Sequence, residues 1–177
     1  MRAKPAAWVC VTLLIILNGC SAVPIEDYAE NSPILVAETF FNGQLTASGI
    51  VKDRSGRVIR YFNATIDASW ESGVGTLDER FVFDDGEHQT RVWTLQRTGN
   101  GVYNATAGDV IGDSTMKVSG NSLFMQYVLR IPYGDGTIDV NVDDRMYQVS
   151  DTVLLNESVM SKWGVKVGQI TLVIQKK

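Results

Sequence analysis

Strict alternation of apolar and polar residues is the feature that most limits what this chain can fold into. It is clearest over residues 58–70, where five apolar side chains occupy every second position: Phe62, Ala64, Ile66, Ala68 and Trp70. Successive side chains of a β-strand point to opposite faces, so this spacing predicts a strand with one buried face.

Short turns separate similar segments along the rest of the chain. The expected strands cover residues 45–52, 58–70, 76–84, 88–98, 102–111, 122–132, 137–142 and 168–175. Asp85-Gly86 lies between two of them and favours the positive φ of a tight hairpin. Residues 143–156 remain ambiguous, and a short helix at residues 156–162 is one option.

The pattern predicts an all-β fold, an antiparallel meander of about nine or ten strands. A sandwich is the alternative. We favour a lipocalin-like barrel, because short turns rather than long crossovers join successive strands.

The first residues have the layout of a bacterial lipoprotein signal peptide. Arg2 and Lys4 precede an apolar run from Ala6 to Leu17, which is too short for a membrane-spanning helix. The run ends in Leu17-Asn18-Gly19-Cys20, which resembles the lipobox. We therefore expect residues 1–19 to be removed and Cys20 to carry palmitate-type acyl chains. An ordinary secretory signal is the alternative.

Lipidation would leave the mature chain without a free thiol, because Cys10 and Cys20 are its two cysteines. Residues 20–42, which include Pro24 and Pro33, are expected to be the lipidated N-terminus and tether, and residues 43–177 the barrel domain. Ser21 follows the lipidated cysteine, and by resemblance to enterobacterial sorting this implies the periplasmic face of the outer membrane rather than the inner membrane.

Charge limits the partners of the chain. The formal net charge is −4, and it becomes −6 when Arg2 and Lys4 are removed. Such an acidic chain is not expected to bind nucleic acid, or an anionic lipid surface, by bulk charge.

Several short stretches resemble a family of proteobacterial lipoproteins known as domain of unknown function 3833. They are spread over the expected barrel: Gly43-x-Leu45-x-Ala47-x-Gly49, Val51-Lys52-Asp53-Arg54-x-Gly56, Gly75 to Phe81, Asp85-Gly86-Glu87, Arg91-Val92-Trp93, Ala107 to Val110, Gly120-Asn121-Ser122, Asp143 to Met146 and Leu155-Asn156. The resemblance implies a cell-envelope or lipid context and brings no established activity. By weaker analogy the barrel resembles calycins, although Gly43-Gln44-Leu45 stands where lipocalins have Gly-x-Trp.

The sequence offers little for catalysis or metal binding. It has no Gly-x-Ser-x-Gly elbow and one histidine, His88, which we expect to face solvent. Zinc would need Cys or His partners, and the turns at residues 84–87 and 134–139 lack the alternating ligands of a calcium loop. We predict no catalytic residue, no metal and no cofactor.

Charged residues occur where the alternation predicts the barrel interior. Glu79 falls between Leu77 and Phe81, and Arg91 shares a strand face with Trp93. A buried charge is costly unless it is paired. These positions predict either an interior ion pair or a clamp for the polar end of a ligand. The candidate ligand-binding residues are Glu79, Arg91, Trp93, Asp109, Tyr127 and Asp144. For Trp93 and Tyr127, packing in the core is the favoured interpretation and a place in the pocket is the alternative.

The leading hypothesis is a membrane-tethered, periplasm-facing lipoprotein that binds or carries a small apolar or lipid-like molecule. The alternative is a structural or interaction lipoprotein with an unidentified protein partner. A lipid-modifying enzyme working through carboxylates is a third hypothesis.

Overall fold

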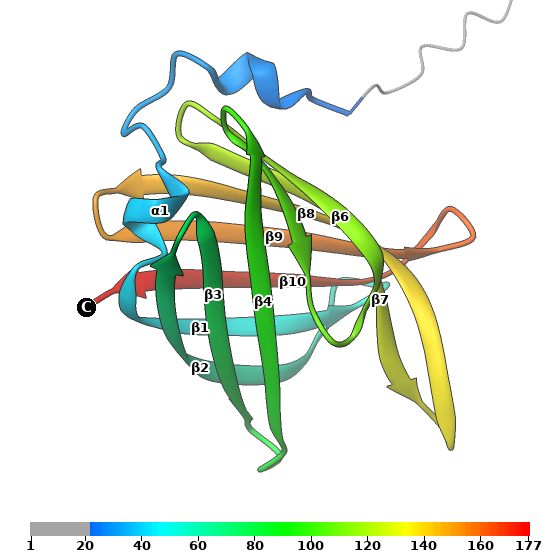
Figure 1. Ribbon diagram of the computed structural model, residues 1–177. Coiled ribbons are helices and arrows are strands. Elements are labelled where there is room, and N and C mark those ends of the chain that lie inside the picture. Colours follow the sequence, from blue (N-terminus) through cyan, green and yellow to red (C-terminus); the bar gives the residue numbers. More distant parts are fainter. Residues whose placement is uncertain (1–21) are drawn as a thin grey trace, which may run out of the picture.

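A computed structural model of the chain describes residues 22–177. The expected signal peptide and Cys20 lie outside these residues. Within them, the chain forms ten antiparallel strands that close into one barrel (Figure 1). Their bounds are β1 Gly43–Asp53, β2 Val58–Glu71, β3 Val74–Phe83, β4 His88–Gly99, β5 Val102–Thr106, β6 Val110–Ser119, β7 Ser122–Tyr133, β8 Gly136–Ser150, β9 Val153–Lys162 and β10 Val165–Lys176.

Consecutive strands pair along the whole meander, and β1 closes the barrel by pairing with β10. Every strand therefore has both of its partners within residues 43–176. The predicted all-β meander and its closure into a barrel are confirmed. Among residues 22–177, no helix is long and apolar enough to cross a membrane.

The alternation read from the sequence determines which side chains fill the barrel. In β2, Phe62, Ala64, Ile66 and Ala68 are buried, while the residues between them are exposed. In β7, Leu123, Met125 and Leu129 are buried in the same way. The apolar core therefore lies inside the barrel, as expected for a small barrel filled by side chains.

Two expectations about the strands were wrong. Residues 102–111 are not one strand, because the chain turns at residues 107–109 between β5 and β6. Residues 156–162 are not a helix but part of β9. The inward positions Asn156 and Ser158 of β9 are polar, which hid its alternation from the sequence reading.

Residues 22–42, expected to act as a tether, lie partly against the barrel. They contain a 3₁₀ helix, η1 (Ile25–Tyr28), and a single-turn helix, α1 (Ala37–Phe40). Leu35, Ala37, Phe40 and Phe41 belong to the core cluster.

α1 marks one end of the barrel (Figure 1). The indole Nε1 of Trp70, near the end of β2, donates to the carbonyl of Phe41 at 2.8 Å. Lys176, at the end of β10, donates to the carbonyl of Thr39.

Candidate functional site

The barrel contains a partly open cavity of about 110 Å³. Every strand except β5 contributes to its wall. Most of the lining is apolar, including Phe62, Leu77, Met125 and Leu172. The space is somewhat smaller than an engineered apolar cavity of about 150 Å³ that binds benzene. The cavity can therefore hold a molecule smaller than benzene or one end of a larger one.

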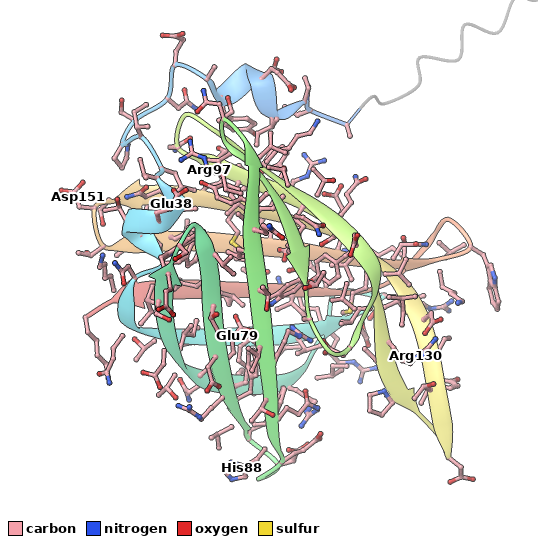
Figure 2. All side chains as sticks on the ribbon, in the orientation of Figure 1. Glu38, Glu79, His88, Arg97, Arg130 and Asp151 are labelled. Atoms are coloured by element: carbon pink, nitrogen blue, oxygen red, sulfur yellow. The ribbon has the colours of Figure 1, made fainter. Side chains whose placement is uncertain are left out.

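Alternation places a few polar side chains in this apolar wall. Glu79 lies between Leu77 and Phe81 on the inner face of β3, and Figure 2 shows it on that strand. Arg91 and Trp93 reach the cavity from β4, and Tyr127 reaches it from β7. Asp144 of β8 reaches the same cavity and is buried.

Arg91 is held by Asp109. The carboxylate of Asp109, in the β5–β6 turn, accepts from Nε of Arg91 at 3.0 Å and from Nη2 at 2.8 Å. Burial lowers the pKa of Arg91, but the hydrogen bonds to Asp109 leave it above its ordinary value. A bidentate pair of this kind fixes the plane of the guanidinium.

Glu79 is opposite Arg91 in the β3–β4 register but forms no ion pair or side-chain hydrogen bond among residues 22–177. Burial raises its pKa from 4.5 to about 7. The charge of Arg91 lowers this pKa, whereas the charges of Asp144 and Asp109 raise it. Glu79 is thus a carboxyl group at the cavity wall that gains or loses its proton near neutral pH.

Asp144 lies in a hydrogen-bonded cluster with neighbouring strands. It accepts from the Asn156 amide, from the Ser158 hydroxyl at 2.8 Å and, more weakly, from the Tyr127 hydroxyl at 3.4 Å. Burial raises the pKa of Asp144, and these three hydrogen bonds partly oppose the rise. Neutral donors rather than a cation therefore solvate this carboxylate.

Trp93 and Tyr127 join the two sides of the cavity. Their rings pack edge to face, with centroids 5.3 Å apart, although they come from β4 and β7. Burial also raises the pKa of Tyr127 well above 10, so its hydroxyl stays protonated and can act as a donor.

The structure thus brings all six predicted residues to one region. Glu79, Arg91, Trp93, Tyr127 and Asp144 line the cavity, and Asp109 anchors Arg91. Their role in ligand binding stays a prediction. Sequence reasoning missed Asn156 and Ser158, which also line the cavity. The signal that could have found them is their two-residue spacing from buried Leu154.

The described residues contain no group of three or more His, Cys, Asp and Glu side chains placed to hold a metal ion. His88 is exposed at the start of β4, and Figure 2 shows it at the tip of the β3–β4 hairpin, away from Glu79.

A closed antiparallel meander with a partly polar cavity defines a lipocalin-like barrel. The fold is similar to the S-type phycobiliprotein lyase CPES from Guillardia theta, with a TM-score of 0.57 and 9% identity over 81% of this chain and 94% of that one. A further match, EF1p2_mFAP2b bound to DFHBI, has a TM-score of 0.44 and 8% identity over 81% of this chain and all of that one.

The chain belongs to the family described as Protein of unknown function (DUF3833), whose model matches residues 14–176. The resemblance read from the sequence is thereby confirmed. No curated protein matches the sequence.

Proposed function

We propose that the protein binds a small amphiphilic molecule inside the barrel, with the polar end held at Glu79. The carboxyl of Glu79, at an apolar cavity wall and without a partner in the described residues, is the observation that carries this proposal. Glu79 is half-buried, so a ligand that covers it has to replace the remaining contact with water by a hydrogen bond. A ligand that supplies this hydrogen bond avoids the free-energy cost of an unpaired carboxyl group.

The charges around the cavity favour a ligand whose polar end donates hydrogen bonds. Arg91 is already engaged by Asp109, so Glu79 and Asp144 have no cation of their own among residues 22–177. A ligand carboxylate would add a further negative charge to this region. A hydroxyl, amide or protonated amine would instead donate to Glu79. The ligand's apolar part would lie against the aromatic and methionine side chains of the wall, and methionines adapt readily to different shapes.

The test compares short alkyl ligands of equal chain length that end in an amine, a hydroxyl or a carboxylate. A ligand that binds only the folded state raises the unfolding temperature. We expect the amine and the alcohol to stabilise the protein and the carboxylate to have little effect. Glu79→Gln should abolish the preference for the amine, since the variant has no negative charge at this position.

Binding of the amine should also strengthen as pH rises through about 7, because Glu79 becomes ionised. A protein that none of these ligands stabilises, and that yields no bound molecule in native mass spectrometry, would contradict the proposal. The similar fold of the S-type phycobiliprotein lyase CPES from Guillardia theta is compatible with binding inside the barrel.

We also propose that the protein acts at the cell envelope as a lipoprotein anchored through Cys20 at the periplasmic face of the outer membrane. The apolar run, Gly19 and Cys20 support this proposal. Metabolic labelling with palmitate in the native host should label the wild-type chain but not Cys20→Ala. Sucrose-gradient separation of the two membranes would then identify which one carries the protein. Labelling that persists in Cys20→Ala would exclude this anchor.

A further inference from the structure

Two neighbouring hairpin tips lie at the end of the barrel opposite α1. β10 finishes beside α1, so the turn that begins it lies at the other end. β1 pairs with β10, and Asp53 at the end of β1 is opposite Gly168. The tips at residues 52–58 and 161–168 are therefore adjacent. Figure 1 shows the β9–β10 hairpin, in orange, standing out from the barrel.

These tips have a charge opposite to that of the whole chain. Together, residues 52–58 and 161–168 contain five cations and one carboxylate, Asp53, whereas the chain as a whole carries a net charge of −4. The five cations are Lys52, Arg54, Arg57, Lys162 and Lys166.

Most of these cations have no salt-bridge partner in the described part of the chain. Arg57 contacts Asp53 at 3.6 Å, but the other four cations form no salt bridge among residues 22–177. Lys162 donates to the carbonyl of Asp139, and Lys166 donates to the amide oxygen of Gln169.

The β9–β10 tip also exposes large apolar side chains. Trp163 is 88% exposed, Val165 60% and Val167 41%. Lys162 pairs with Val165, so Trp163 and Gly164 form a two-residue turn, and both have positive φ. Asn, Asp or Gly is favoured at the Trp163 position, and a bulky residue there is strained. Trp163 thus occupies an unfavourable backbone position without burying its ring against the chain.

We propose that the β9–β10 tip inserts Trp163 and Val165 into the interfacial layer of a bilayer that contains anionic lipids. Because the hairpin projects from the barrel, its tip can enter the headgroup layer of a bilayer. Indole rings favour the headgroup level of membranes, and lysines can extend their ammonium groups towards lipid phosphates. The cations of the two tips would add electrostatic attraction to anionic headgroups, which local charge can provide even though the bulk charge of the protein is acidic.

Acidic residues at the same end of the barrel restrict how the barrel would lie on the membrane. The β3–β4 tip carries Asp84, Asp85 and Glu87, of which Asp85 and Glu87 are paired with Arg60. An anionic surface would repel this tip. Contact is therefore expected through the β9–β10 and β1–β2 tips, with the β3–β4 tip turned away.

The test uses residues 22–177, which include every strand partner and lack the N-terminal segment expected to carry lipid. The domain is mixed with phosphatidylcholine vesicles that contain or lack phosphatidylglycerol, and the vesicles are sedimented. We expect the domain to sediment with the anionic vesicles, with a blue shift in tryptophan emission. Added salt should weaken binding because it screens the attraction.

Trp163→Asn removes the ring but retains a residue that tolerates positive φ, so the turn should be preserved. We expect at least about tenfold weaker partitioning into vesicles, as the ring supplies most of the inserted apolar surface. Lys162→Gln with Lys166→Gln should reduce the preference for anionic vesicles. The matched control is Tyr133→Asn, since Tyr133 is 72% exposed at the β7–β8 tip beside an acidic residue, Asp135.

Circular dichroism would confirm that each variant keeps the sheet. Failure of the wild-type domain to sediment with anionic vesicles would overturn the proposal and leave an acidic protein surface as the alternative partner. Equal binding by wild type and Trp163→Asn would overturn it as well. Neither outcome depends on whether the cavity binds a ligand.

Discussion

Glu79 and Arg91 lie opposite each other on β3 and β4, yet the guanidinium of Arg91 is bound to Asp109. This choice of partner explains why the pKa of Glu79 reaches about 7, since burial raises it and Arg91 offsets that rise only in part. An ion pair between Glu79 and Arg91 would have joined β3 to β4 and left neither charge available to a ligand. The observed arrangement instead leaves a titrating carboxyl at the cavity wall.

Glu79→Gln should make the stability of the barrel less dependent on pH. Because folding raises the pKa of Glu79 from 4.5 to about 7, its stabilising contribution is fully present below pH 4.5 and is lost as pH rises through about 7. The loss amounts to at most about 3 kcal/mol. Denaturant unfolding from about pH 5 to about pH 8 should therefore show a smaller fall in the variant than in wild type.

Glu157→Gln is the matched control, because Glu157 is exposed on the outer face of β9. It should follow the wild-type pH profile. If Glu79→Gln followed it too, the carboxyl would not titrate with a raised pKa in the folded protein.

Asp109→Asn should lower the pKa of Glu79. The substitution releases Arg91 from its bidentate partner and removes a negative charge that raises the Glu79 pKa. Both effects favour the ionised form of Glu79. A carbon-detected NMR titration of the glutamate carboxyl groups should show one resonance with a midpoint near 7 in wild type, shifted to lower pH in the variant.

Asp143→Asn provides a comparison, because Asp143 accepts a bidentate hydrogen bond from Arg145 and is not among the charged groups that shift the pKa of Glu79. It should leave the Glu79 midpoint unchanged. An unchanged midpoint in Asp109→Asn would mean that Asp109 and Arg91 do not control the titration of Glu79.

The strands that could be predicted are those whose inward residues are apolar. The alternation of Phe62, Ala64 and Ile66 predicts β2, because the buried positions of this strand are also its apolar ones. β9 reverses this pattern, since Asn156 and Ser158 face inward while Leu155 and Val159 lie on the exposed face. The buried carboxylate of Asp144 accepts from both residues and makes polar side chains favourable at those inward positions, and it lies on another strand.

The sequence predicted which residues belong to the candidate site, but not which of their side chains form hydrogen bonds with one another. Alternation alone placed Glu79 and Arg91 on inner faces of the barrel. The partner of Arg91 depends on the turn at residues 107–109, which the sequence reading merged into a strand. Contacts between side chains far apart in the sequence depend on the register and closure of the whole barrel, which local patterns do not specify.

Ser158→Ala should destabilise the barrel, and more at high pH than at low pH. The Ser158 hydroxyl donates to Asp144 at 2.8 Å. Loss of this hydrogen bond should further raise the pKa of Asp144, which burial has already raised. Removing a donor from a buried carboxylate costs about 1–3 kcal/mol. Because the ionised form suffers most, the cost should grow as pH rises through the folded-state pKa of Asp144.

The control for this change is Ser48→Ala. Ser48 is exposed, and its hydroxyl donates to the Asn63 amide oxygen at 2.7 Å. Its removal should change the unfolding free energy by less than about 0.5 kcal/mol at any pH. Equal effects of the two substitutions would contradict a buried, ionised Asp144.

Gly120→Ala should loosen the segment that leads into the barrel. Gly120 has φ +52 in the β6–β7 turn, and a Cβ there would lie 1.8 Å from the carbonyl oxygen of Tyr28. The carbonyl of Gly120 also accepts from the backbone N–H of Leu35 at 2.8 Å. The new methyl group therefore displaces the backbone around Tyr28 and with it the hydrogen bond to Leu35.

Gly134→Ala is the control that separates the clash with Tyr28 from the strain of a positive φ. Gly134 has φ +56 in the β7–β8 turn, but a Cβ there meets nothing within 4 Å. It should cost only about 1–2 kcal/mol for the positive φ. Gly120→Ala should cost more and should also speed proteolytic cleavage near residues 28–36, which limited proteolysis with mass spectrometry would detect. Equal stability and equal cleavage in the two variants would mean that contact with Gly120 does not hold this segment against the barrel.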